Sequence, residues 1–353
     1  MGYHTLAFIG RFQPFHNGHK AVVDKALGLA DKVAIVIGSH DIPRNSRNPF
    51  TTAERIAMIT AVYPDEVAAG RIAFVPQEDH TYNMDRWIAG VTTGVNAVAL
   101  AGGWTDTPPK IGLIGHAKDS SSFYLKAFPH WGSVEVANVD GIDATNLRGL
   151  IFCKRASKWI NSIGVTAAAM MPPEAAIYVA RWVTKEVNGA FMAVCAEAEF
   201  IRDYKKQFEV LPYPPTFNTT DAIVVQSGHV LLVKRGAQPG KGLWALPGWF
   251  LEQDETQLDG VLRELREETR IAVPTPVIRG SLVAVKTFDD PHRSLRGRTI
   301  TQAFYFRLAD KETLPKIKGS DDAEKARWVP LAELKRSMMY EDHYDMIQSM
   351  VGI

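Results

Sequence analysis

The stretch Gly10-Arg11-Phe12-Gln13-Pro14-Phe15-His16-Asn17-Gly18-His19 decides the fold of the first half of this chain. It follows a short apolar run, Leu6 to Ile9, and it leads into a helical apolar stripe within His19 to Leu29. The β-branched run Val33 to Ile37 comes next. A strand, a helix and a strand in this order predict a right-handed crossover in a parallel sheet.

The same alternation continues along the chain. Further buried-strand patterns occur at Ile72–Val75, Ile111–Ile114 and Val134–Ala137, and helical patterns fall between them at Thr52–Val62 and Arg86–Leu100. The sequence therefore predicts a doubly wound α/β domain with a parallel sheet, whose ligands are expected at the carboxyl ends of the strands.

The pattern changes in the second half. A mainly helical stretch, Glu174 to Phe208, starts after Pro172-Pro173, and the proline-rich stretch Leu211 to Thr216 follows it. Short strands interrupted by one helix then predict an α+β domain: the strands are Asp221–Gln226, Val230–Lys234, Ser281–Lys286 and Thr301–Phe306, and the helix is Thr256–Thr269. We expect a first domain at residues 1–180, a helical segment and linker at 181–217, and a second domain at 218–353.

Composition limits the classes of partner. A chain of 353 residues is longer than one typical domain core, so about two domains are expected. Its formal net charge of +1 does not favour binding to nucleic acid or to an anionic membrane by overall charge. Cys153 and Cys195 are the two cysteines and lack metal-ligand spacing. The sequence has no signal-peptide pattern and no apolar run of ~18 residues. We expect a cytoplasmic protein that acts on small molecules, and a homo-oligomer is left open.

His16 and His19 are the candidate catalytic residues of the first domain. They lie between a buried strand and a helix, so backbone N–H groups and the positive helix end face any bound anion. Gly10 and Gly18 allow close backbone approach. Both histidines can donate to phosphate oxygens, and such bonds strengthen as charge builds in a transition state.

Three glutamates mark a second candidate site. Glu264, Glu267 and Glu268 share one face of the Thr256–Thr269 helix, while an apolar stripe forms the other. Hard carboxylate ligands suit magnesium or manganese, with substrate phosphates completing the shell. The alternative is a solvated acidic face paired with Arg263 and Arg266.

The first motif resembles the nucleotidyltransferase superfamily with a His-x-Gly-His signature, and Gly-Arg-Phe-Gln-Pro-Phe-His resembles its archaeal-type nicotinamide mononucleotide (NMN) adenylyltransferases. A second superfamily motif, Ile-Ser-x-Thr-x-x-Arg, matches Ile142 to Arg148 except that Asp143 replaces serine. The resemblance implies catalysis by His16, His19 and Arg148, and ATP contacts at Gly10, Arg11, Phe12, Gly18, Asp143 and Thr145.

Other segments resemble the same family. It has an aromatic residue that stacks on the nicotinamide ring, which implies NMN contacts at Trp87 with Tyr82 and Asn83. The alternative for Trp87 is a core aromatic on a helix. The stretch Ile114 to Ser122, which contains three serines, also resembles the family, and a solvated loop is its alternative.

The second motif resembles the Nudix box, in which Glu255 and Arg263 to Glu268 match with correct spacing. The resemblance implies structural roles for Gly248, Glu255 and Arg263, with Glu255 and Arg263 paired, and a catalytic role for Glu268. Two positions depart from the box: Trp249 stands at its leading glycine and Arg270 at its closing glycine. The aromatic and basic loop after the box offers ADP-ribose contacts at Phe288, Arg293, Arg296 and Arg298, or is an exposed hairpin.

The whole chain resembles the bifunctional bacterial family that joins such an adenylyltransferase to a Nudix ADP-ribose pyrophosphatase. The resemblance implies that ATP and NMN give NAD and pyrophosphate in the first domain. In the second, ADP-ribose would give AMP and ribose 5-phosphate with Mg²⁺ or Mn²⁺. Two alternatives remain: the first domain adenylylates another phosphate such as riboflavin phosphate, or the second senses a NAD metabolite or cleaves another nucleoside diphosphate derivative.

Overall fold

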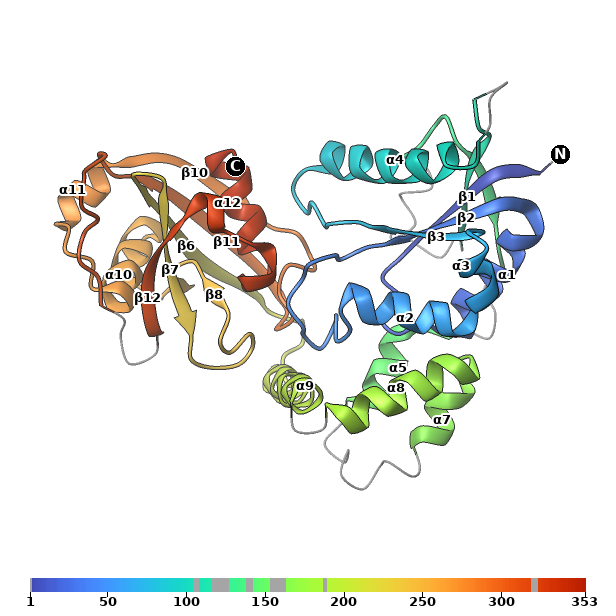
Figure 1. Cartoon of the computed structure of the whole chain (residues 1–353). Helices are drawn as coiled ribbons and strands as arrows, with labels where there is room; N and C mark the ends of the chain where they lie inside the picture. Colours follow the sequence, from blue (N-terminus) through green and yellow to red (C-terminus); the bar gives the residue numbers. More distant parts are fainter. Residues whose placement is uncertain are drawn as a thin grey trace. The chain divides into compact units, whose positions relative to one another are not determined.

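The computed structural model describes residues 2–103, 108–115, 127–137, 142–152, 163–186, 189–318 and 323–353. The chain divides into two compact units, Met1–Ala198 and Glu199–Ile353. Each unit is built around a sheet of its own (Figure 1). Among the described residues, no helix is long and apolar enough to cross a membrane.

A parallel sheet of five described strands forms the centre of the first unit, in the order β3-β2-β1-β4-β5. The strands are β1 Tyr3–Gly10, β2 Ala30–Ile37, β3 Ile72–Pro76, β4 Ile111–Gly115 and β5 Gly132–Glu135. The order reverses between β1 and β4, so the carboxyl end of β1 lies at a topological switch point, where open α/β sheets bind ligands. The predicted doubly wound fold is confirmed.

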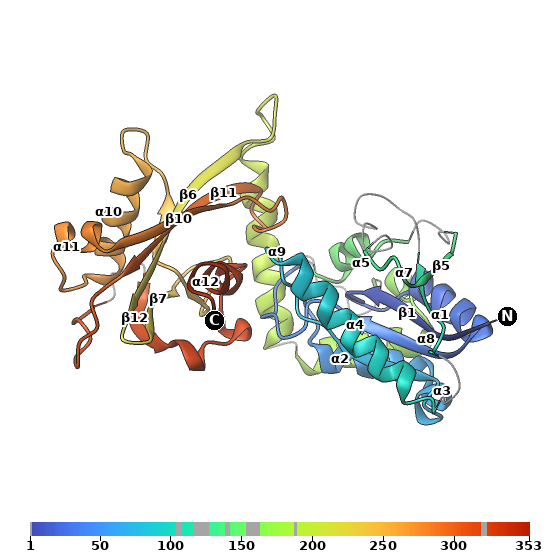
Figure 2. The same cartoon turned by 90° about the horizontal axis from the view of Figure 1, so that it is seen from above.

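Helices cover both faces of this sheet (Figures 1 and 2). Alternate β1 residues serve the two faces: Leu6 and Phe8 face the core under α1 and α2, and Ala7 and Ile9 face α4. The described helices of this unit are α1 Asn17–Leu29, α2 Thr52–Val62, α3 Pro64–Ala68, α4 Met84–Leu100, α5 Ala144–Ile151, α7 Ile163–Ala169, α8 Pro173–Lys185 and α9 Ala190–Lys206, which continues into the second unit.

The first core extends further along the chain than expected. The helical stretch is two helices, α8 and α9, and buried side chains of both join the core: Trp182, Phe191, Val194, Cys195 and Ala198. A boundary at residue 180 would cut through this core, so it lies too early. The proline-rich stretch is exposed, with Tyr213 at 80 %.

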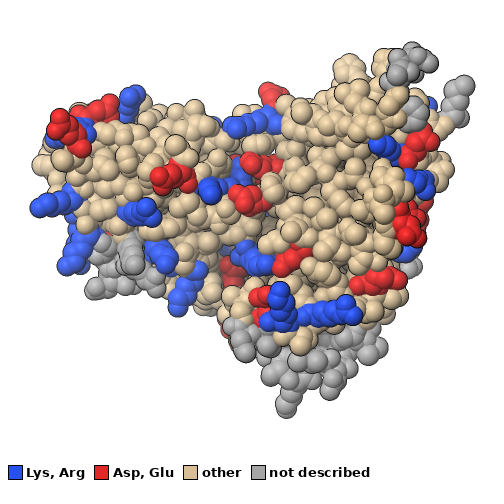
Figure 3. All heavy atoms as spheres, viewed as in Figure 1, with Lys and Arg blue, Asp and Glu red and all other residues tan. Residues whose placement is uncertain are grey.

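The second unit contains a mixed sheet in the order β10-β11-β6-β7-β12, with β8 paired to β7 and β9 to β6. The strands are β6 Thr216–Gln226, β7 His229–Arg235, β8 Trp244–Ala245, β9 Gly248–Phe250, β10 Leu282–Phe288, β11 Arg298–Arg307 and β12 Ala323–Pro330. Its helices are α10 Gln257–Thr269, α11 Thr275–Gly280 and α12 His343–Val351. The buried stripe Val261, Leu262 and Leu265 of α10 packs on Ala222 and Val224 of β6, as the helical spacing predicted. Figure 3 shows acidic and basic side chains interspersed on the viewed faces.

Candidate active sites

The first candidate site lies where β1 leads into α1. His16 is the N-cap residue of α1 and His19 lies in its first turn. Their rings stack with centroids 3.7 Å apart, and the backbone N–H of His16 donates to Nδ1 of His19 at 3.4 Å. A Cβ at Gly18 would lie 3.1 Å from the His16 ring, so glycine leaves room for that ring. Both predicted histidines therefore meet at a helix N-terminus, a favourable place for an anion.

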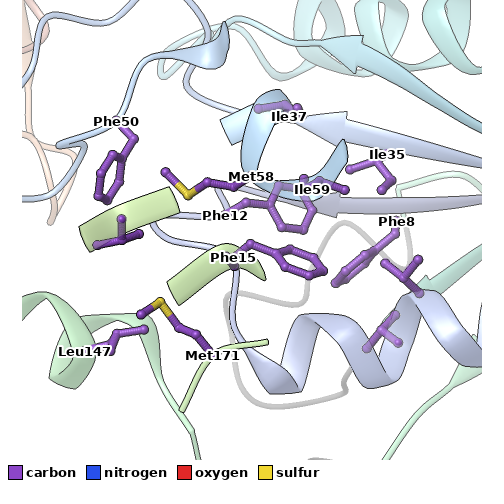
Figure 4. Packing of buried hydrophobic residues seen from close by; sticks show 14 of the residues in the cluster. Phe8, Phe12, Phe15, Ile35, Ile37, Phe50, Met58, Ile59, Leu147 and Met171 are labelled. Carbon is purple, nitrogen blue, oxygen red and sulfur yellow. The ribbon is translucent and has the colours of Figure 1, made fainter. Parts of the chain in front are cut away.

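Gly10 and Phe12 shape the turn itself. Phe12 has a left-handed backbone, φ 52°, and its ring is 1 % exposed among Phe8 and Phe15 (Figure 4). A Cβ at Gly10 would lie 2.9 Å from that ring. The side chain of Phe12 is thus a core group, and a contact of this residue with ATP, which would have to come from its backbone, stays a prediction.

Three arginines, Arg11, Arg47 and Arg148, bring positive charge to this turn. Arg148 donates to the carbonyl of Gln13 at 3.0 Å and to Oγ1 of Thr145 at 3.2 Å. Burial, and then the charges of Arg47 and Arg148, lower the pKa of Arg11 to about 9. Burial and Arg47 lower the pKa of Arg148 to about 10. Nη1 of Arg11 is buried without a hydrogen-bond partner in the protein. Such a cluster favours a ligand with several negative charges.

Asp143 caps α5. Its carboxylate accepts hydrogen bonds from the backbone N–H groups of Thr145 and Asn146, the latter at 3.3 Å. Burial would raise the pKa of Asp143, but these bonds outweigh it and the pKa is lowered. Aspartate therefore does the capping work of the family's serine, and Thr145 holds Arg148. Contacts of Asp143 and Thr145 with ATP stay predictions.

Tyr82, Asn83 and Trp87 gather at the start of α4. Asn83 is its N-cap and accepts from the N–H of Arg86 at 3.0 Å. Trp87 is half-buried, with its ring centroid 6.0 Å from that of Phe128 and packed on the core of that face. Core packing thus accounts for the burial of part of the indole. A contact of Trp87 with nicotinamide stays a prediction. Of the Ile114–Ser122 segment, residues 116–122 lie outside the described residues, as does Cys153.

Residues outside the expected set of site residues hold the loop between β2 and α2. Arg55 is 1 % exposed and donates to four carbonyls, those of Arg11, Gly38, Ser39 and Thr51. Ser39 donates through its N–H and hydroxyl to Asp79 at 3.0 and 2.6 Å. The loop carries Arg47 to the arginine cluster. The capping box of Thr51 and Glu54 indicates from the local sequence where α2 begins. No local pattern indicates which distant residues hold the loop.

The second candidate site lies along α10. Thr256 caps the helix, and Arg270 ends it in the left-handed conformation, φ 43° and ψ 38°, that the family's glycine would adopt. Arg263 pairs with Glu255 through two bonds of 3.0 and 2.7 Å, as the box implies. The same guanidinium bonds Glu264 at 2.6 Å and Glu267 at 3.1 Å.

Gly248 anchors Glu268. Its N–H donates to Oε2 of Glu268 at 3.0 Å. A Cβ at position 248 would lie 2.1 Å from the carbonyl oxygen of Thr220, so this position requires glycine. Burial, together with the charges of Glu264 and Asp221, raises the pKa of Glu268 to about 8 against the lowering effect of the Gly248 bond.

The chemistry of these carboxylates fits a divalent cation. Burial also raises the pKa of Glu264, and a cation between two such groups offsets their mutual repulsion. In the present arrangement Arg263 neutralises Glu264 and Glu267. Across the described ranges, no three His, Cys, Asp or Glu side chains are grouped to hold a metal ion.

Two of the residues expected to contact ADP-ribose are buried. Phe288 is fully buried, so its ring cannot stack on a nucleotide. Arg293 forms a buried two-bond ion pair with Asp342 at 2.9 Å, which uses its Nε and Nη2 for structure. Arg298 donates to the carbonyl of Asp289, and half-buried Arg296 lies over the Phe250 ring at 5.0 Å. Contacts of Arg296 and Arg298 with a ligand stay predictions.

The family comparisons agree with this division. A cytidylyltransferase-like family model matches residues 7–148, and a NUDIX domain model matches residues 216–350. Over 144 residues the chain is 42 % identical to a nicotinamide/nicotinic acid mononucleotide adenylyltransferase of Acinetobacter baylyi, covering 40 % of this chain and 72 % of the relative. Over 147 residues it is 33 % identical to an ADP-ribose pyrophosphatase of Methanocaldococcus jannaschii, covering 42 % and 78 %.

A solved structure matches both units together. The bifunctional NMN adenylyltransferase/ADP-ribose pyrophosphatase of Francisella tularensis, complexed with AMP and a manganese ion, has a TM-score of 0.87 and 33 % identity, covering 99 % of each chain. The two units are thus a nucleotidyltransferase and a Nudix domain. The chain belongs to the family of bifunctional NMN adenylyltransferase/ADP-ribose pyrophosphatases.

Proposed function

We propose that the first unit joins ATP and NMN to give NAD and pyrophosphate. The phosphate of NMN attacks the α-phosphorus of ATP in line, the bond from that phosphorus to the β-phosphate oxygen breaks, and pyrophosphate leaves. His16, His19 and Arg148 hold the phosphates and stabilise the developing charge, so catalysis consists of positioning and electrostatics. Two observations carry this proposal: the stacked histidines at the start of α1, and the cluster of Arg11, Arg47 and Arg148.

The second unit, in the same proposal, hydrolyses ADP-ribose to AMP and ribose 5-phosphate. Glu264, Glu267 and Glu268 would hold Mg²⁺ or Mn²⁺, which neutralises diphosphate charge and lowers the pKa of bound water. Arg263, anchored by Glu255, positions the carboxylates of α10. Gly248 holds Glu268 in place.

Product analysis of the purified full chain tests both halves. ATP with NMN should give NAD and pyrophosphate, and ATP with riboflavin phosphate should give no dinucleotide. ADP-ribose with Mg²⁺ or Mn²⁺ should give AMP and ribose 5-phosphate. If ADP-ribose binds but no AMP appears with either metal, the second unit is a sensor and only the first half of the proposal stands.

A further inference from the structure

Trp249, where the second site departs from the box, is a large aromatic side chain left 47 % exposed. It lies in β9, which contacts α10, and it follows directly after Gly248, the residue that holds Glu268. Its strand pairs with β6 through Thr220. An exposed indole therefore lies one residue after Gly248, whose N–H holds Glu268. The position at which the backbone requires glycine is 248, not 249.

Arg296 completes an aromatic and cationic surface with Trp249. Its guanidinium carbon lies 6.0 Å from the centroid of the Trp249 indole and 5.0 Å from that of Phe250. The Phe250 ring stands nearly perpendicular to the indole, at 85° and 5.5 Å. Nε of Arg296 is buried and has no hydrogen-bond acceptor in the protein. Because Nε is buried, a ligand acceptor would meet the terminal Nη groups of this guanidinium.

We propose that Trp249 and Arg296 form the subsite for the nucleobase of the substrate that the second unit cleaves, a nucleoside diphosphate derivative. The indole stacks on the base, and the Arg296 guanidinium donates to an acceptor at its edge. This inference rests on the proposed hydrolase function. A bare phosphate site would gain nothing from an exposed indole, whereas every base offers a π-face to stack on.

Binding of the two halves of ADP-ribose to the full chain tests the subsite. AMP carries the base, and ribose 5-phosphate does not. With Mg²⁺ present, the difference in tryptophan fluorescence between the parent and Trp249→Phe reports on Trp249 alone. AMP should change that difference signal, and ribose 5-phosphate should leave it unchanged. This measurement needs no hydrolysis, so it decides the inference even if the proposed hydrolase function fails.

Inhibition of ADP-ribose hydrolysis gives a second readout. Trp249→Ala should weaken inhibition by AMP on the order of tenfold, as expected when one stacked base is lost. Inhibition by ribose 5-phosphate should stay the same, and Trp249→Phe should recover most of the AMP effect. Tyr213→Ala, which removes another exposed aromatic of this unit, is the matched control and should change neither. An unchanged AMP effect, or equal weakening of both inhibitors, overturns the proposal.

Discussion

His19 lies among aromatic rings in the first turn of α1, 4.9 Å from the Phe12 centroid and 3.7 Å from that of His16. His19→Ala should cut NAD synthesis on the order of 10²-fold or more, because a donor to transition-state charge is lost. Steady-state rates of both reactions measure this. Lys20→Ala is the control, since Lys20 forms an exposed pair with Asp24 at 2.7 Å and lies over the Tyr63 ring, 5.7 Å from its centroid. ADP-ribose hydrolysis should be unchanged; equal loss of both activities in a folded variant contradicts two independent sites.

Arg270 holds a left-handed backbone that costs an L-residue about 1–2 kcal/mol, while glycine loses about 0.5–1 kcal/mol in entropy. Because its side chain is exposed, little contact is lost on replacement. Arg270→Gly should therefore stabilise the second unit by roughly 0.5–1 kcal/mol. Calorimetric unfolding of the full chain measures it, and hydrolysis should persist. Arg270→Ala keeps the Cβ and should give no such gain; an equal gain from alanine refutes the strain argument.

Helix α9 supports the loop that carries Arg47. Glu197 is 5 % exposed, and its Oε2 accepts the N–H of Ser46 at 2.7 Å. Oδ1 of Asn45 accepts the N–H of Arg47 at 2.9 Å, which tightens the same turn. Glu197→Ala should loosen the loop and raise the KM for ATP on the order of tenfold, the cost of about one buried charged hydrogen bond.

A double-mutant comparison separates this role from general destabilisation. If Glu197 acts through Arg47, the Glu197→Ala change should add little in an Arg47→Ala background. Glu197→Gln keeps an acceptor and should recover part of the loss. Fully additive effects, or no recovery by glutamine, would place Glu197 outside ATP binding.

The elements with strong local patterns were predictable, and those fixed by tertiary contacts were not. Thr52–Val62 matches α2 residue for residue, because a cap and an apolar stripe define it within one segment. Strand β9 has three residues and exists only through pairing with β6. The end of the first core was misplaced because Trp182 and Phe191 are buried by partners distant in sequence, such as Phe50 and Phe152.

The same division applies to the sites. His16 and His19 were predictable as a pair because both lie at the start of one helix, and the pair of Glu255 with Arg263 followed from the resemblance to the Nudix box. Arg47, Asp79 and Glu197 reach the first site only through long-range contacts. The burial of Phe288 was not predictable because an aromatic residue at a strand end gives no local sign of the face that it will occupy.

The two reactions are assigned to two units with separate cores, and a change at Glu268 tests whether the two sites act independently. Glu268→Gln should abolish ADP-ribose hydrolysis, because a carboxylate needed for the cation is lost, while NAD synthesis persists. The pKa of Glu268 is raised to about 8, chiefly by burial. Its ionised form therefore destabilises the metal-free fold as pH rises from its unfolded value of 4.5 through about 8, and the neutral amide removes that cost.

Calorimetric unfolding of the full chain checks this at pH 6 and pH 8. Without metal, the variant should be no less stable than the parent, and its advantage should grow from pH 6 to pH 8, since below 4.5 the parent's carboxyl is neutral in both states. With Mn²⁺, the parent should gain more than the variant, because binding to the native state adds stability by mass action. Glu252→Gln, which neutralises an exposed carboxylate before the helix, is the control and should change neither. Equal stabilisation of Glu268→Gln and the parent by Mn²⁺ would mean that Glu268 does not bind the cation. Other residues would then have to hold the metal for hydrolysis, and the assignment of the first site would be unaffected.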